Sequence, residues 1–322
     1  MMKLLLVCGV LGSSLLAESM QKSEWIRPTK IPTPKNNLIT KEKIVLGKKL
    51  FFDPILSRAN NISCMSCHNP LKGWSDADQI AIGDKGLHGI RNTPTLLNSA
   101  YQYIYFWDGR AKSLEEQALG PLSTHVEMNL DPKEAVKKLK TIPAYQVMFQ
   151  KAFPKEGITV QTLAQALATF ERTIVSGESR FDKYVGGDKT QLTDQEIKGF
   201  YTFVNKGNCT ICHSGFNFSD QSFNNVGINN GDMGRGKIRK RALWKGTFKT
   251  PTLRNIVNTS PYFHDGSVKK LEDAVAFCAK GERDKNTTIS LTLMDKHLSD
   301  KEIHGIVEFL HTLSEPVVDL TL

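Results

Sequence analysis

The chain contains the pattern Cys-x-x-Cys-His twice, at residues 64–68 and again at residues 209–213. This pattern is the attachment signature of c-type haem: two thiols form thioethers to the vinyl groups, and the histidine coordinates the iron. A zinc site or a redox dithiol would not need a histidine directly after the second cysteine, twice. The sequence therefore predicts two haem c groups in two modules. The predicted haem-binding residues are Cys64, Cys67 and His68 for haem 1, and Cys209, Cys212 and His213 for haem 2.

The first 17 residues have the features of an export signal. Lys3 precedes an apolar run from Leu4 to Ala17 that is interrupted only by small residues. We expect a signal peptide over residues 1–17, since the run is too short to span a bilayer; an uncleaved anchor is the alternative. Covalent haem attachment takes place outside the cytoplasmic membrane, so we expect the mature protein to be periplasmic. No later segment is long and apolar enough to cross a membrane.

Cysteine usage and charge limit the remaining functions. Four of the six cysteines belong to the haem motifs and Cys8 lies in the leader, so Cys278 remains alone and no disulfide is expected in the mature chain. The formal net charge of +9 suggests attraction to an acidic partner surface. Nucleic acid is a poor partner, because the lysines are scattered and the expected compartment is wrong.

Helix signals dominate the chain, and strand signals are few. Capping residues predict helices that begin after Thr40, Asp131, Thr159, Thr193 and Ser299. A further helix is expected over Leu271–Ala279. The predicted fold class is mostly α, with two cytochrome c-like haem domains and long loops.

The length of 322 residues is sufficient for two domains. We expect an N-terminal peroxidatic haem domain over residues 18–178, which begins with an extended arm at residues 18–38. A C-terminal electron-transfer haem domain is expected over residues 179–322. The glycines and charges of residues 176–191 indicate a linker between the domains.

Motifs beyond the haem pentads resemble those of the bacterial dihaem cytochrome c peroxidase family, which includes the MauG-like enzymes. The resemblance extends from about Leu46 to Leu313. Its motifs are Leu46–Phe51, Arg91–Thr95, Phe106–Arg110, Val126–Met128, Ser179–Asp182, Pro251–Asn255 and Pro261–Gly266. The resemblance implies a low-potential, peroxide-binding haem 1, a high-potential haem 2 at which electrons enter, and calcium between the domains. It also implies a small cytochrome c or cupredoxin as electron donor, and often a homodimer.

Three catalytic residues follow from the resemblance. Glu127 matches the distal carboxylate, which can move a proton between the two oxygens of peroxide. Gln117 matches the distal amide that hydrogen-bonds those oxygens, and Trp107 matches the aromatic residue between the haems. By residue type alone, Glu127 would be a solvated loop carboxylate and Trp107 a core residue.

The family's calcium ligands match Asn92, through its side chain, and Thr259 and Pro261, through their carbonyl groups. Hard oxygen donors of this kind suit calcium. Ordinary hydrogen bonding within turns is the alternative interpretation of these residues.

Two positions depart from the family pattern. Asp84 stands where the family has a loop histidine that leaves the haem 1 iron on activation. His88 could substitute, although a histidine on a glycine-rich loop is more often solvated. We therefore expect haem 1 to be open without reductive activation.

The second departure concerns the sixth ligand of haem 2. Cys278 stands where classical members have methionine and MauG-like members have tyrosine. A thioether raises a haem potential and a thiolate lowers it. Met294 is therefore favoured as the ligand, with Cys278 second; Cys278 could equally be a buried apolar residue.

These features favour an enzyme that reduces hydrogen peroxide to water with electrons from a small redox protein. A MauG-like oxidase that modifies a partner protein is the first alternative. A non-catalytic dihaem electron-transfer cytochrome is the second, and Glu127 and Gln117 argue against it.

Overall fold

The computed structural model describes residues 24–281, 290 and 293–315. The expected signal peptide, with Cys8, lies outside the described residues. The described part is rich in helices joined by long loops, as the predicted fold class requires, and none of its helices is long and apolar enough to cross a membrane. The helices are α2 (Lys41–Phe52), α3 (Cys64–Cys67), α4 (Leu114–Ser123), α5 (Pro132–Lys140), α6 (Pro143–Ala152), α7 (Val160–Arg172), α8 (Arg180–Gly186), α9 (Asp194–Val204), α10 (Gly236–Arg239), α11 (Leu271–Lys280) and α12 (Asp300–His311).

Short elements occupy the loops. Two strands, β1 (Phe223–Asn224) and β2 (Phe248–Lys249), pair in antiparallel fashion. The 3-10 turns are η1 (Pro54–Leu56), η2 (Pro70–Lys72), η3 (Asp84–Gly86), η4 (Ser99–Tyr101), η5 (Lys189–Gln191), η6 (Cys209–Ile211), η7 (Ala242–Trp244) and η8 (Ile256–Asn258).

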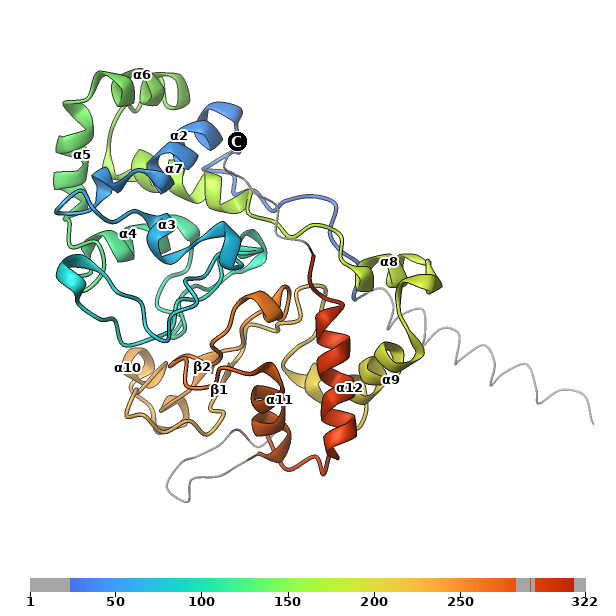
Figure 1. Cartoon of the computed structure of the whole chain (residues 1–322). Coiled ribbons are helices and arrows are strands. Elements are labelled where there is room, and N and C mark those ends of the chain that lie inside the picture. Colours follow the sequence, from blue (N-terminus) through green and yellow to red (C-terminus); the bar gives the residue numbers. More distant parts are fainter. Residues whose placement is uncertain (1–23, 282–289, 291–292, 316–322) are drawn as a thin grey trace, which may run out of the picture.

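One hydrophobic cluster forms where α2 packs on α7 (Figure 1). Thr40 caps α2 by accepting a hydrogen bond from the Lys43 amide, as predicted. Close approach of the two helices requires a glycine, because a Cβ on Gly47 would lie 2.1 Å from the Ala166 carbonyl oxygen. Phe51 and Phe170 then meet edge to face at 5.2 Å, and both are buried. The first haem motif, in α3, packs against this cluster through Cys64.

A second cluster forms where α9 packs on α12. Capping boxes at Thr193 and Ser299 begin these helices, as predicted. A Cβ on Gly199 would lie 1.9 Å from the Gly305 carbonyl oxygen, so a glycine also sets the helix spacing here. Phe309 fills the contact and is fully buried. The second haem motif follows α9 directly.

The expected linker at residues 176–191 is wrong in part. Residues 180–186 form α8, which Ser179 caps, and Phe181 is fully buried in the second cluster. Arg254 also donates two hydrogen bonds of 2.7 Å to Asp182 in a buried ion pair. Glycine and charge content suggested a linker, but the long-range partners of this segment could not be read locally. The domain boundaries themselves stay a prediction.

The described part of the N-terminal arm has no helix or strand, and it packs against both clusters. Trp25 is 2% exposed and stacks on Phe218 at 4.7 Å, so it belongs to the second cluster. Asn37 contacts the first cluster's helix α7, where its side chain donates to the Gln165 carbonyl at 3.0 Å. The arm therefore ties the two clusters together before α2 begins.

Candidate functional site

Both motif histidines are prepared to bind a metal through the same ring nitrogen. The Nδ1 atom of His68 lies 3.1 Å from the Trp74 carbonyl oxygen, and that of His213 lies 2.9 Å from the Phe218 carbonyl oxygen. An Nδ1–H that donates to a carbonyl leaves Nε2 as the coordinating atom and fixes the ring orientation. Burial lowers the pKa of His68 to about 4 and also lowers the pKa of His213, so both rings are neutral at pH 7. Neutral imidazoles are what a haem iron requires.

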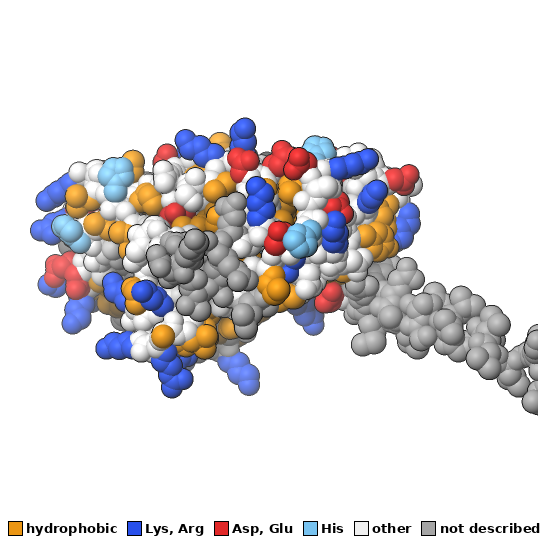
Figure 2. Space-filling view, turned by 90° about the horizontal axis from the view of Figure 1, so that it is seen from below, with side chains coloured by type: hydrophobic (Ala, Val, Ile, Leu, Met, Phe, Trp, Pro, Cys, Tyr) orange, Lys and Arg blue, Asp and Glu red, His pale blue; other side chains and the backbone are white. Residues whose placement is uncertain are grey.

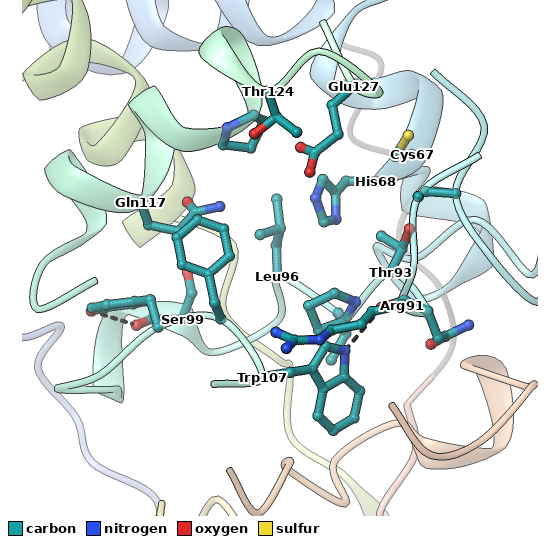
Figure 3. Close-up of a pocket in the computed structure, with 18 of the residues that line it drawn as sticks. Cys67, His68, Arg91, Thr93, Leu96, Ser99, Trp107, Gln117, Thr124 and Glu127 are labelled. Atoms are coloured by element: carbon teal, nitrogen blue, oxygen red, sulfur yellow. Dashed lines mark hydrogen bonds between the residues drawn. The ribbon is translucent and has the colours of Figure 1, made fainter. Parts of the chain in front are cut away.

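A cavity of about 580 Å³ lies beside His68. Cys64 and Cys67 line it with the histidine, so all three expected attachment atoms of haem 1 face one space. Figure 3 shows His68, Gln117 and Glu127 directed into this space from different elements. Gln117 comes from α4, and its Oε1 atom is buried without a hydrogen-bond partner among the described residues. An orphaned polar atom on the cavity wall fits a site that a haem and its small ligand fill.

A tight turn after α4 holds Glu127 at the cavity. Its backbone N–H donates to the Thr124 carbonyl at 3.0 Å, and the next residue, Met128, is 3% exposed and anchors the turn in the first cluster. Burial raises the pKa of the Glu127 carboxyl, while the nearby Arg110 opposes the shift. A carboxyl whose pKa is raised holds an accepted proton more firmly than a solvated carboxylate does, and it can still release that proton to a second acceptor.

Asp84 does not face the cavity but supports the Glu127 turn. It is 1% exposed, its backbone N–H donates to the Glu127 carbonyl at 2.7 Å, and its carboxylate accepts from Asn129 at 2.7 Å. His88 is exposed and is not among the described residues that line the cavity. The loop thus presents no histidine to the haem 1 site.

Trp107 lies at the junction of the two halves of the molecule. Its Nε1–H donates to the Asn92 carbonyl at 2.9 Å, and its ring lies edge-on to His264 at 6.5 Å. Its carbonyl accepts from the Lys249 backbone N–H at 2.8 Å, which joins the loop of Trp107 to β2. The indole also lines the cavity, so it borders the haem 1 site from the side of the second module (Figure 3).

The three expected calcium-binding residues lie on the wall of this same cavity. The Asn92 Nδ2 donates to the carbonyl oxygens of Asp78, at 2.9 Å, and Gln79, at 3.3 Å. Its amide oxygen is then the atom that can ligate a cation, together with the carbonyls of Thr259 and Pro261. The three residues therefore line one cavity, and a calcium site among them stays a prediction.

The structure also places two cavity residues that the sequence did not single out. Lys249 lies deep in the junction, where its ammonium contacts the Gln102 side-chain oxygen, and burial lowers its pKa to about 8. Glu171 is 4% exposed, its Oε2 has no partner among the described residues, and burial raises its pKa to about 8. Both line the cavity. Neither belongs to a motif with a local signature, so only the packing reveals them.

At the second site, Cys278 and Met294 have different surroundings. Burial raises the pKa of the Cys278 thiol to about 12, and the neighbouring Cys212 adds to the shift. Cys278 in turn raises the pKa of Cys209, so the thiol lies near both attachment cysteines of haem 2. Met294 is 56% exposed. These surroundings favour Cys278, the reverse of the order expected from haem potentials.

Comparison with known proteins identifies the family. The family profile described as di-haem cytochrome c peroxidase matches residues 41–190. The methylamine utilization protein MauG of Methylorubrum extorquens is 40% identical over 94% of this chain and 86% of its own. The chain belongs to the di-haem cytochrome c peroxidase family. The resemblance seen in the sequence is thereby confirmed.

Other relatives include both branches of the family. The cytochrome c551 peroxidase of Pseudomonas aeruginosa is 37% identical over 92% of this chain and 86% of its own. A crystal structure of a MauG-like protein associated with microbial copper homeostasis has a TM-score of 0.84 at 28% identity, over 92% of this chain and 97% of that one. The predicted fold class is confirmed, and membership of the family implies an oxidoreductase with two haem c groups. The relatives do not by themselves select one reaction.

Proposed function

We propose that this protein is a periplasmic dihaem cytochrome c peroxidase that reduces hydrogen peroxide to water. The observation that carries the proposal is the convergence of Glu127 and Gln117 on the cavity of His68 (Figure 3). A plain electron-transfer cytochrome needs neither an acid nor an amide opposite its haem ligand. Export to the periplasm rests on the leader at residues 1–17. The electron donor is a small cytochrome c or cupredoxin, and a homodimer is the expected assembly.

The chain's residues fit two haems. Cys64, Cys67 and His68 would hold one, and Cys209, Cys212 and His213 the other. When bound, the haems supply two irons that change oxidation state, of which the first also binds peroxide. Lys249 faces the first cavity as a cation whose partner among the described residues is a neutral amide, so a haem propionate would complete its pairing.

Glu127 and Gln117 have different roles toward peroxide: the first transfers a proton and the second donates a hydrogen bond. Glu127 takes the proton from one oxygen and delivers it to the leaving oxygen, and its raised pKa suits both steps. The Gln117 amide donates a hydrogen bond that orients the molecule. Trp107 lies between the modules and shortens the electron path from the second site. Asn92, Thr259 and Pro261 would hold a calcium ion that fixes the junction.

A MauG-like oxidase is the second candidate, and three observations favour it. The identity to MauG of Methylorubrum extorquens is 40%. In addition, the loop at Asp84 presents no histidine to the haem 1 site, and Cys278 rather than a methionine lies near the second attachment pair. In this case the oxidising equivalents would leave through the second module to a partner protein.

The test uses the fully oxidised dihaem protein as isolated. We expect high-spin character at haem 1, and peroxide turnover with a reduced small cytochrome without any prior reduction of the enzyme. An entirely low-spin protein that does not consume peroxide would overturn the proposal in favour of a plain electron-transfer cytochrome. A protein that reacts with peroxide but cannot oxidise any reduced donor would favour the MauG-like candidate.

A further inference from the structure

The segment 233–249 concentrates positive charge to an unusual degree. It contains seven Lys and Arg residues and no Asp or Glu, although the chain as a whole contains 33 acidic residues. We call its exposed part, residues 237–245, the basic platform. The lysines are scattered along the chain as a whole, but this segment concentrates Lys and Arg. Exposed cations of the platform are Lys237, Arg239, Lys240, Arg241 and Lys245.

Apolar side chains lie among these cations. Leu243 is 74% exposed and Ile238 is 43% exposed. The platform consists of α10 and η7, which lie at the lower left of Figure 1. In Figure 2, Lys and Arg side chains crowd this left-hand part of the face, with hydrophobic atoms between them. A charged rim around a small apolar centre is typical of a surface that binds another protein transiently.

Contacts of Arg235 and Gly236 hold the platform against the rest of the protein. Arg235 is buried, and its Nη1 donates to the carbonyl oxygens of Asp108, at 2.9 Å, and Gly109, at 2.6 Å. Its guanidinium also covers the Phe223 ring at 4.2 Å. A Cβ on Gly236 would lie 2.9 Å from the Lys245 Cα, so α10 and the end of η7 are in close contact. A preorganised surface loses little conformational entropy when a partner binds.

The platform lies close to both haem sites. Trp244 meets Phe223 edge to face at 6.3 Å, and the next residue, Asn224, donates to the Cys212 sulfur at 3.5 Å. Two side-chain contacts thus connect the platform to an attachment atom of haem 2. On the other side, Lys237 and Ile238 line the cavity of His68.

We propose that the basic platform is the docking surface for a redox protein with an acidic face. The proposal rests on the proposed function, since it names the surface at which that reaction's electron partner binds. Charge complementarity selects an acidic partner, and the path from Trp244 to Cys212 selects one that exchanges electrons. An anionic membrane fits less well, because α10 has only four residues and cannot form an extended amphipathic face.

The test variant replaces Arg239, Lys240, Arg241 and Lys245 by glutamine; none of them lines the cavity. The matched control replaces Lys133, Lys140, Lys151 and Lys155, on and near α5 and α6, by glutamine. These four lysines are also exposed, so the control removes the same charge. The probes are two small c-type cytochromes of similar potential, one acidic and one basic. Binding is measured with both proteins oxidised, and electron transfer is measured by stopped flow at low and high salt.

Electrostatic steering changes association rates by about 10- to 10³-fold. We therefore expect the platform variant to lose ~10-fold or more in association rate with the acidic cytochrome at low salt, and to lose most of its salt dependence. The control variant should change little, and peroxide turnover with a small uncharged reductant should be the same in all three proteins. The basic cytochrome should react slowly with each of them.

Equal loss in both variants would overturn the proposal, because net charge alone would then explain the effect. Unchanged kinetics in the platform variant would also overturn it. If that variant lost binding to vesicles of anionic lipid while its cytochrome kinetics were unchanged, the surface would be a membrane contact. If the cytochrome bound through the platform but the protein did not turn over peroxide, the docking proposal would stand and the proposed peroxidase function would fail.

Discussion

The two haem sites have the same local chemistry at the motif histidine and differ in the side chains that surround the motif. In each, the motif histidine contacts a backbone carbonyl a few residues later, at Trp74 or Phe218. At the first site the facing wall holds Gln117 and Glu127 around a cavity of about 580 Å³. Near the second site, the attachment cysteines have the Cys278 thiol as a neighbour. The local attachment motif is therefore the same at both sites, while the side chains around it come from distant parts of the sequence and differ.

The largest expected effect tests this division directly. Replacing His68 by glycine should abolish peroxide reduction, because the only distal acid and amide that we assign belong to its cavity. Haem 2 should stay attached and redox-active, which a haem stain and a reduced spectrum would show. His213→Gly is the matched variant. It should keep the reaction of haem 1 with peroxide but lose oxidation of the donor cytochrome.

Full turnover by His68→Gly would invert the assignment of the two sites. Loss of both haems from either variant would show instead that the sites fold together, and the comparison would then need conservative changes such as histidine to lysine.

Glu127→Gln sharpens the comparison within the first site. Haem content and peroxide affinity should be retained, while turnover falls by about 10²–10⁴-fold, the usual contribution of general acid–base catalysis. The wild-type rate should fall as the pH drops through the raised pKa of Glu127, since protonation removes the base, and this acid limb should vanish in the variant. Glu134→Gln, at an exposed position on α5, is the control. Near-normal turnover in Glu127→Gln would show that the carboxylate only lines the cavity.

At the second site, Cys278→Ser and Met294→Leu separate the two candidate ligands. Because Cys278 lies near both attachment cysteines and Met294 is exposed, Cys278→Ser should change the haem 2 spectrum and Met294→Leu should not. Loss of a thiolate would raise the haem 2 potential, because anionic sulfur stabilises ferric iron. The opposite pattern, with loss of a near-infrared sulfur-to-iron band in Met294→Leu, would restore the thioether ligand favoured by the sequence.

Features with a local cause were readable from the sequence. The haem pentads, the caps at Thr40, Thr193 and Ser299, and the mostly helical class depend on neighbours within a few residues. Trp25 and Phe181 could not be placed in the second cluster, because their partners are distant in the chain. The choice between Cys278 and Met294 stays a prediction for a related reason: the haem potential indicates which ligand chemistry is favourable, whereas the packing shows which side chain is near the attachment cysteines.

The charge of the junction was missed for a second reason. A lysine is ordinarily solvated, and nothing in the local sequence distinguishes Lys249 from its neighbours. Its depth in the protein arises only when β2 packs against the loop of Trp107. The basic platform was missed for another reason. Its charges are visible in the sequence, but their exposure and their position beside both haem sites are not.

The smallest expected effect concerns this charge between the sites. Lys249→Met should lower the potential of haem 1, because a buried cation beside the cavity favours the reduced, more negative state. A shift of tens of millivolts is expected, equivalent to roughly 1 kcal/mol for one electron. Gln102→Leu is the matched variant, since it removes the ammonium's neutral partner and keeps the charge, and its potential should hardly change. Spectroelectrochemical titration resolves the two haems. An equal shift at both haems would show that the sites share one electrostatic field, whereas no shift with a lowered melting temperature would make Lys249 a packing residue only.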